Sequence, residues 1–158
     1  MPDVIQLGLE ESELERLGGL WTAREIAQQP AMLRETQKLL MARRAEIEGF
    51  LDPLLAEPTL RVILTGAGTS AFAGGCLAPV LSARLGRRVE AIATTDLVCA
   101  PHLYFEPDTP TLLVSLGRSG NSPESVAAIE LADRLVKTLS HLVITCNADG
   151  ALATYGRG

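Results

Sequence analysis

Two short segments of the chain combine glycine with hydroxyl side chains, and each comes directly after an apolar run. The first is Thr65-Gly-Ala-Gly-Thr-Ser70, which leads straight into a helix-like segment. Gly66 and Gly68 allow a tight turn and a close approach of the backbone to a ligand. Thr69, Ser70 and the free amides of a helix start can donate hydrogen bonds to an anion. This segment therefore predicts an anion-binding turn.

The same segment also fits a second kind of site. Residues 66–71 read Gly-Ala-Gly-Thr-Ser-Ala, which satisfies the glycine pattern of dinucleotide-binding folds with alanine in the last place. That pattern expects an acidic residue at the end of the second strand, where it holds a ribose. Here the second apolar run ends in Ala93-Thr-Thr95, with Glu90 near its start and Asp96 beyond it. The dinucleotide interpretation is therefore the weaker one.

The second segment follows the third apolar run and again opens a helix. Residues 117–124 read Gly-Arg-Ser-Gly-Asn-Ser-Pro-Glu. Hydroxyls and amides suit a phosphate monoester, and Arg118 adds a positive charge unless it is only a solvated loop residue. The alternative is structural, with Ser122 as a helix cap and the glycines as turn residues. If the two segments follow neighbouring strands, one crevice collects the hydroxyls of Thr69, Ser70, Ser119 and Ser122.

Four short apolar runs separated by helix-length segments predict an α/β fold. Their lack of alternation is typical of parallel strands that helices cover on both faces. A helix over 70–85 is expected to end at Gly86, a natural left-handed terminator. A second helix over 123–139 begins with Ser122-Pro123, an N-cap followed by proline at the first helical position. The stretch 95–105 holds a shorter helix. This order predicts a right-handed, doubly wound α/β sheet with its ligand site at the carboxyl ends of the strands. The predicted strands are Arg61–Thr65, Val89–Ala93, Thr111–Leu116 and His141–Cys146.

The first part of the chain shows helical patterns and no strand-like run. We therefore predict a helical lead-in over residues 1–58 and the α/β domain over 59–158. Thr22-Ala-Arg-Glu25 has the spacing of a capping box, and Pro30 is expected to interrupt the segment. Beyond Pro30 a mostly apolar stripe predicts an amphipathic packing helix, with contact to a partner as the alternative. The stripe consists of Met32, Leu33, Thr36, Leu39, Leu40, Arg43 and Ile47.

The composition argues against several kinds of partner. The 158 residues include 14 Lys and Arg against 19 Asp and Glu, so the net charge of -5 attracts neither nucleic acid nor an anionic membrane. Aromatic residues make up 4%, too few for a base-stacking platform. The three cysteines and two histidines are scattered, and no apolar run reaches membrane-spanning length. We predict a cytoplasmic protein without a disulfide framework, a metal site or a cofactor.

Three motifs taken together resemble one known family. They lie at residues 21–30 (Trp-Thr-Ala-Arg-Glu-Ile-Ala-Gln-Gln-Pro), 65–70 and 115–125 (Ser-Leu-Gly-Arg-Ser-Gly-Asn-Ser-Pro-Glu-Ser). The combination resembles the sugar isomerase (SIS) domain family. Within it, the motifs resemble the branch of tagatose-6-phosphate ketose/aldose isomerases, which includes galactosamine-6-phosphate deaminases. The resemblance covers nearly the whole chain from Gly18 onward and implies a flavodoxin-like, three-layer αβα fold.

The resemblance implies a phosphate-binding role for both loops. In that family the two turns hold the phosphate of a sugar phosphate. Gly117 stands where many relatives have another serine, and Arg118 stands where glutamine is common, which favours the tagatose-6-phosphate branch. The candidate phosphate-binding residues are Gly68, Thr69, Ser70, Gly117, Arg118, Ser119, Gly120, Asn121 and Ser122.

The resemblance also implies two tandem SIS domains, with the acid/base glutamate supplied largely by the second. Residues 59–158 are then expected to be the first SIS domain, incomplete after its fourth strand, and the catalytic residues of this chain stay unknown. Among the other titratable residues, His102 is interpreted as a surface or packing residue. Asp96 and Glu124 are interpreted as helix-start carboxylates.

The function implied by the resemblance is aldose-ketose isomerisation of a hexose or amino-sugar 6-phosphate, with release of ammonia as an option. The chain taken alone is expected to be inactive. A non-catalytic regulatory module that binds a phosphosugar is the alternative, and a DNA-binding helix-turn-helix before residue 58 would favour it. None is evident in the sequence. The resemblance further implies a homodimer or a higher homo-oligomer.

Overall fold

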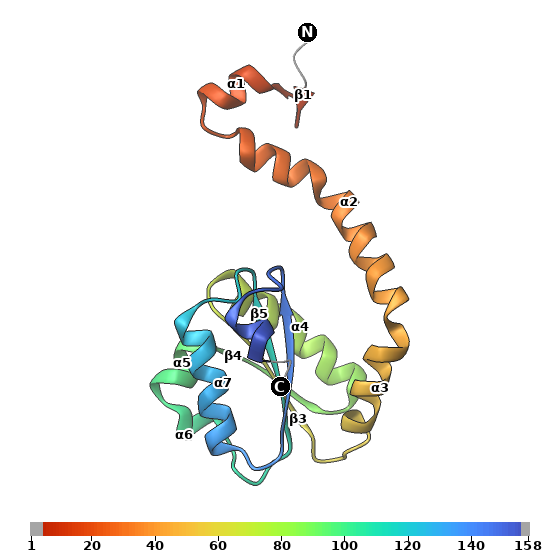
Figure 1. Ribbon diagram of the computed structural model, residues 1–158, viewed down its shortest axis with the longest axis vertical. Coiled ribbons are helices and arrows are strands. Elements are labelled where there is room, and N and C mark those ends of the chain that lie inside the picture. The colour runs from red at the N-terminus through yellow and green to blue at the C-terminus, as the bar shows by residue number, and fades with distance from the viewer. Residues whose placement is uncertain (1–4, 156–158) are drawn as a thin grey trace. The chain divides into compact units, whose positions relative to one another are not determined.

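The computed structural model describes residues 5–155 of the chain. The chain divides between Leu51 and Asp52 into two compact units, of which the first carries the red and orange colours of Figure 1. No helix within residues 5–155 is both long enough and apolar enough to cross a bilayer. Each unit is built from its own local contacts, and the second holds the larger core.

The first unit is mainly helical. It opens with β1 (Ile5–Gln6) and β2 (Leu9–Glu10), which pair antiparallel, and continues through α1 (Glu11–Arg16) and α2 (Leu20–Ala42). α3 (Arg44–Leu55) crosses the boundary between the units. The expectation that this region lacks strands was wrong, because the hairpin is too short to leave a strand-like run. Its buried cluster consists of Leu14, Leu20 and Ala23.

The second unit contains a four-stranded parallel sheet. Its strands are β3 (Arg61–Gly66), β4 (Arg88–Ala93), β5 (Thr111–Gly117) and β6 (Leu139–Thr145). They lie side by side in the order β4-β3-β5-β6. Along the chain, β4 is added on one side of β3, and β5 and β6 are added on the other. The predicted doubly wound α/β fold is confirmed, and β3 and β5, which precede the two glycine loops, are direct neighbours.

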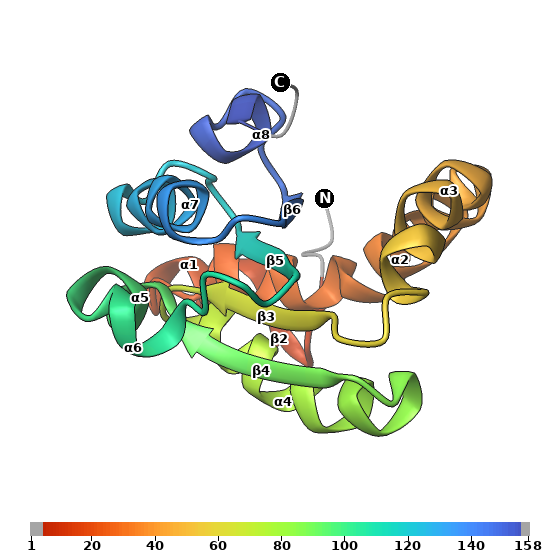
Figure 2. The same ribbon diagram turned by 90° about the horizontal axis from the view of Figure 1, so that it is seen from below.

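Helices cover both faces of this sheet (Figure 2). α4 (Thr69–Leu85) lies on one side, while α5 (Thr94–Cys99) and α7 (Pro123–Leu135) lie on the other. The shorter helices α6 (Pro101–Tyr104) and α8 (Ala151–Tyr155) follow α5 and β6. The prediction that α4 ends at a glycine is confirmed, since its C-terminal neighbour Gly86 has the left-handed φ of 60°.

The main core lies between the sheet and the helices α5 and α7. Ile63 and Leu113 pair in register on neighbouring strands, and both side chains are fully buried. Burial on both faces explains why the central strands are continuously apolar rather than alternating. The rest of this core consists of Ile92, Leu97, Phe105, Ala128, Ile129, Ala132, Val136 and Leu152.

Two predictions about α2 were wrong. The helix begins at Leu20 after Gly19, so Thr22 and Glu25 lie inside it rather than at its start, and no side chain caps it. Pro30 also lies inside α2 and does not end it. The flanking residues are mostly strong helix formers, so the helix tolerates the loss of one backbone hydrogen bond at the proline.

The apolar stripe beyond Pro30 is not packed against other parts of the first unit. Met32 and Leu33 are 50% and 71% exposed, and Leu39 and Leu40 are 57% and 53% exposed. The first unit itself therefore does not supply the surface that the predicted packing helix requires. The physical reason is that the first unit offers α2 no second apolar layer beyond its small cluster near Leu20.

The helix predicted over 123–139 is α7, and it is shorter than predicted because it ends at Leu135. Val136 adopts an extended conformation, and the amide of Lys137 donates to the carbonyl of Pro107. The carbonyl of Thr138 in turn accepts from the amide at the start of β5. Residues 136–138 therefore lie outside the helix, and β6 begins directly after them at Leu139.

Arg61 is a buried cation at the start of β3. Its side chain is only 3% exposed, and its Nε donates to Glu90 at 2.6 Å. The guanidinium also donates to the carbonyl of Tyr104 and lies 3.8 Å from Glu106. A hydrogen bond from Arg88 is the main cause that holds the pKa of Glu106 below its ordinary value. This network ties β3, β4 and the end of α6 together at the edge opposite the glycine loops.

Removing the partner of this buried cation should destabilise the protein. We expect Glu90→Ala to lower the free energy of unfolding by about 3 kcal/mol, because it leaves the guanidinium of Arg61 poorly paired in the interior. The matched control is Asp108→Ala, which removes an ion pair to Lys137 of the same 2.6 Å length but with both side chains exposed. That variant should lose less than about 1 kcal/mol. Urea unfolding measures both, and equal losses would contradict the argument from burial.

Candidate functional site

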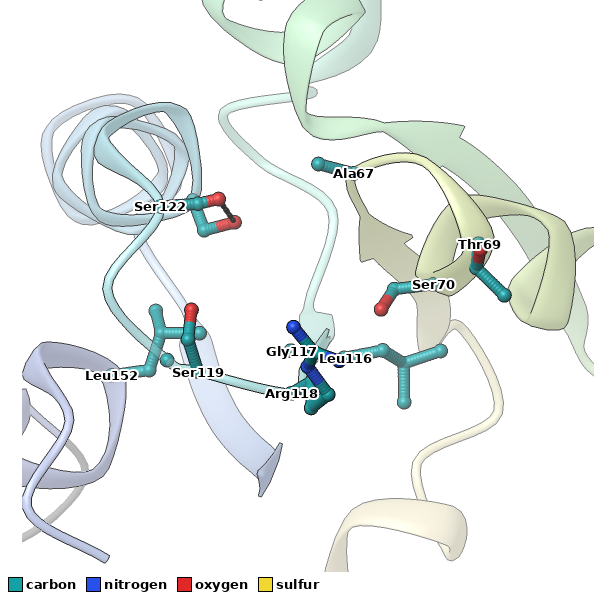
Figure 3. A pocket seen from close by; sticks show the side chains of 11 residues that line it. Ala67, Thr69, Ser70, Leu116, Gly117, Arg118, Ser119, Ser122 and Leu152 are labelled. Carbon is teal, nitrogen blue, oxygen red and sulfur yellow. Dashed lines mark hydrogen bonds between the residues drawn. The ribbon is translucent and has the colours of Figure 1, made fainter. Parts of the chain in front are cut away.

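The two glycine loops lie side by side at the carboxyl edge of the sheet. Gly66 at the end of β3 is the register partner of Leu116 on β5, and α4 and α7 begin a few residues later. Between the loops lies a cavity of about 550 Å³ (Figure 3). It is lined by Ala67, Thr69, Ser70, Leu116, Gly117, Arg118, Ser119, Gly120, Ser122, Ser125 and Leu152.

The first loop can exist only because residue 66 has no side chain. A Cβ placed there would lie 2.6 Å from the Cβ of Ser70 and 2.8 Å from the carbonyl oxygen of Leu116. Both distances are shorter than real Cβ contacts allow, so the first turn of α4 can approach β5 only over a glycine. Gly68, which precedes α4, has a φ of 55°, which favours glycine at this turn as well.

The hydroxyls of the first loop are available to a ligand to different degrees. In Figure 3 the Ser70 hydroxyl points from α4 into the cavity, and within residues 5–155 it has no hydrogen-bond partner. Thr69 also lines the cavity, but it is more exposed to solvent than Ser70. Ser70 is thus the main hydroxyl donor that the first loop offers.

Three successive carbonyl groups of the second loop are engaged in hydrogen bonds to the segment from Thr145 to Leu152. The carbonyl of Arg118 accepts from Thr145 at 3.3 Å, and that of Ser119 accepts from the Asn147 side-chain amide at 2.9 Å. The carbonyl of Gly120 accepts from the Leu152 amide at 2.9 Å. Carbonyl oxygens repel an anion, so engaging them with the β6–α8 segment leaves hydroxyls and amides on the side of the cavity.

Ser119 and Arg118 provide the polar groups of this loop. The Ser119 hydroxyl oxygen accepts a bond of 3.3 Å from the amide of Asn121, which leaves its proton free to donate. Arg118 is exposed, and it is the one charged residue among those that line the cavity within the described chain. An anion placed here would meet neutral donors, two helix N-termini and a single exposed cation.

Ser122 and Ser125 complete the far wall at the start of α7. Ser122 precedes the helix, but its hydroxyl makes no capping bond. It is instead hydrogen bonded to the hydroxyl of Ser125, with 3.3 Å between the two oxygens, and both residues line the cavity. The structural alternative, in which Ser122 serves as a side-chain cap, is therefore wrong for this conformation.

Seven of the nine predicted site residues line this cavity, and two do not. Gly68 shapes the turn without lining the cavity, and the Asn121 side chain accepts a bond of 2.9 Å from the Ala151 amide, a structural contact. His102 is exposed on α6, and neither Asp96 nor Glu124 lines the cavity. The seven are Thr69, Ser70, Gly117, Arg118, Ser119, Gly120 and Ser122.

Four lining residues were not predicted. Ala67 and Leu116 adjoin predicted residues, and Ser125 lies three positions after Ser122, a spacing that puts two side chains on one face of a helix. That spacing is a signal that the sequence carried. Leu152 reaches the cavity from α8, and no local pattern marks it.

The lining can bind an anion but lacks a group that transfers protons. No carboxylate, imidazole or thiol lines the cavity within the described chain. Residues 5–155 also contain no cluster of three or more side chains suited to hold a metal ion. The arrangement can therefore position a phosphorylated molecule, while any proton transfer needs a further group within reach of the reacting carbons.

A comparison with protein families agrees with this geometry. The model of the SIS domain matches residues 54–157, which include both loops and all four strands of the sheet. The chain belongs to the SIS domain family. The match begins close to the division between the two compact units, so it describes the second unit almost entirely.

Most of this chain is similar to proteins named D-galactosamine-6-phosphate deaminase AgaS. The D-galactosamine-6-phosphate deaminase AgaS of Shewanella sp. (strain ANA-3) is 51% identical over 150 residues, covering 93% of this chain and 39% of the relative. The protein of the same name from Escherichia coli is 52% identical over 134 residues, covering 85% of this chain and 35% of the relative.

A solved structure shows the same architecture. The crystal structure of tagatose-6-phosphate ketose/aldose isomerase from Escherichia coli superposes with a TM-score of 0.85 at 50% identity. The superposition covers 88% of this chain and 38% of the solved one. The chain thus spans between a third and two fifths of the length of the relatives it matches.

The glycine at position 66 gives a direct test of the site's construction. We expect Gly66→Ala to lower the free energy of unfolding by about 1–3 kcal/mol, because the added methyl forces α4 away from β5. Gly75→Ala is the control within the same helix, since a Cβ there meets nothing within 4 Å. It should leave stability unchanged or raise it by up to about 1 kcal/mol. Thermal unfolding compares the two, and a stable Gly66→Ala variant would contradict the close approach.

Proposed function

We propose that the cavity binds the phosphate group of a sugar phosphate. The observation that carries the proposal is the convergence of Ser70, Ser119 and Ser122 with two helix N-termini on one cavity, from loops that the family match includes. A phosphate monoester accepts hydrogen bonds from such donors and is favoured by the positive ends of helices. The cavity volume of about 550 Å³ is ample for a hexose phosphate.

We further propose that the whole protein is a ketose/aldose isomerase or deaminase acting on a hexose or amino-sugar 6-phosphate. The relatives' names support this reading, since they combine tagatose-6-phosphate isomerase with galactosamine-6-phosphate deaminase. The proposed reaction opens the sugar ring and then moves a proton between C1 and C2 through an enediol-like intermediate. When the substrate carries an amino group on C2, the proton transfer converts the amine to an imine, and a solvent water hydrolyses this imine to the ketone with release of ammonia.

In this proposal the chain supplies the phosphate-binding half of the reaction. Holding the phosphate fixes the substrate so that C1 and C2 lie in a reacting geometry. The base that moves the proton is proposed to belong to a second SIS domain, since no acid/base side chain lines this cavity within the described chain. Residues 59–158 are proposed as the first SIS domain and residues 1–58 as its helical lead-in.

We also propose that the protein is a cytoplasmic homodimer or higher homo-oligomer. The exposed apolar side chains of Met32, Leu33, Leu39 and Leu40 on α2 support self-association, because a long apolar stripe is rarely left in water. The cytoplasm suits a soluble sugar-phosphate substrate and three exposed cysteines, Cys76, Cys99 and Cys146.

Alanine at the two loop serines tests the phosphate site. We expect Ser70→Ala and Ser119→Ala each to weaken the binding of galactosamine 6-phosphate by roughly tenfold or more, because each removes a hydrogen bond to a charged acceptor. Calorimetric titration of the purified chain measures the affinity, with unphosphorylated galactosamine as a ligand that should bind poorly. Ser82→Ala is the control, since that hydroxyl donates to the Arg87 carbonyl away from the cavity. Unchanged affinity in both loop variants would contradict the proposal.

A turnover assay tests where the catalytic base resides. We expect the 158-residue chain to bind galactosamine 6-phosphate and tagatose 6-phosphate without converting either, because the cavity offers positioning but no proton acceptor. Ammonia release and ketose formation are the two readouts. Conversion by this chain alone, at the rate of a relative such as the Escherichia coli enzyme, would show that the base lies within it.

A further inference from the structure

Ser125 is a buried hydroxyl residue that the phosphate-binding argument has not used. It lies in the first turn of α7, its exposure is 4%, and it lines the cavity behind Ser122. Figure 3 shows the hydroxyl of Ser122 joined by a hydrogen bond to its neighbour on the cavity wall. That neighbour is the hydroxyl of Ser125, with 3.3 Å between the oxygens.

The Ser122 hydroxyl has no other protein partner within the described residues. It makes no capping bond to α7, although its carbonyl accepts from the amides of Ser125 and Val126. Pro123, the next residue, has no amide hydrogen to offer. The orientation of the Ser122 hydroxyl therefore depends on Ser125.

We propose that Ser125 is a positioning residue that donates its proton to the Ser122 oxygen and so directs the Ser122 proton at the bound phosphate. This inference rests on the proposed phosphate site. A hydroxyl has one proton to donate and two lone pairs to accept with. A phosphate dianion only accepts, so Ser122 must give its single proton to the ligand and must itself accept from Ser125.

We call this arrangement, in which Ser125 donates to Ser122 and Ser122 donates to the phosphate, the serine relay. The geometry of the pair agrees with it. The separation of 3.3 Å is longer than the usual value of about 2.8 Å between hydroxyls, so the hydrogen bond is weak in this structure and can shorten. When an anion accepts from Ser122, its oxygen becomes a better acceptor, and the bond from Ser125 strengthens. The burial of Ser125 increases this effect, because water does not compete for its proton.

The relay makes a prediction that a merely structural serine does not. Ser125→Ala should weaken the binding of galactosamine 6-phosphate roughly three- to tenfold, because Ser122 loses the donor that orients it. In the background of Ser122→Ala, the same change should alter the affinity by less than about twofold. Ser125→Thr keeps the hydroxyl and should stay within about twofold of the wild type.

The matched control is Ser115→Ala. Ser115 is also a serine buried near the end of β5, at 2% exposure, but its hydroxyl has no partner within the described chain and does not line the cavity. This variant should bind galactosamine 6-phosphate like the wild type. Thermal unfolding of every variant separates loss of fold from loss of affinity.

Calorimetric titration of Ser125→Ala, Ser122→Ala and the double variant, each compared with the wild type, decides the proposal. Loss of the Ser125 effect in the Ser122→Ala background supports the relay. Equal weakening in both backgrounds overturns it and makes Ser125 an independent contact, while no weakening in either also overturns it. In both of these cases the proposed phosphate site stands as long as the wild type binds. A wild type that binds no galactosamine 6-phosphate overturns the proposed function and the relay together.

Discussion

The close approach over Gly66 is the constraint on which the site depends. Parallel strands bring their carboxyl ends to one edge of a sheet, but neighbouring loops at that edge need not share a cavity. At Gly66 the missing side chain lets the first turn of α4 come against the end of β5. Ser70 is thereby carried to the same cavity as the second loop, whose strand lies beside β3. A single methyl group at this position would therefore force apart the two loops that line the cavity.

The second loop depends on a different part of the chain. The carbonyls of residues 118–120 are each engaged by a group from Thr145, Asn147 or Leu152. Without these donors the carbonyls would have to find other partners, because buried backbone acceptors are rarely left unpaired. The end of β6 and the segment that follows it therefore shape the second loop. They determine that the second loop presents hydroxyls to the cavity and its carbonyls to the protein.

The electrostatics of the site are local. The chain has a net charge of -5, so its overall field does not attract a phosphate. In the proposed site, capture of the phosphate relies on hydroxyl donors, on two helix N-termini and on Arg118, all within one cavity. Neutral donors of this kind hold a phosphate by geometry, and they suit positioning better than proton transfer. The absence of an acid/base side chain from the described lining agrees with the proposal that the catalytic base belongs to a second domain.

The sequence by itself determined the fold class, the four strands, the glycine turns and most of the lining residues. Continuous apolar runs, Gly86 and the hydroxyl loops are local signals, and each depends on residues close together in the chain. Local patterns failed where distant segments decide. The helix α7 ends at Leu135 because residues 136–138 bond to Pro107 and to the start of β5. Pro30 is a different case, since the helix formers on either side of it keep it inside α2. The tertiary structure alone brought Leu152 to the cavity and turned the carbonyls of the second loop away from it, because those contacts join residues about 30 positions apart.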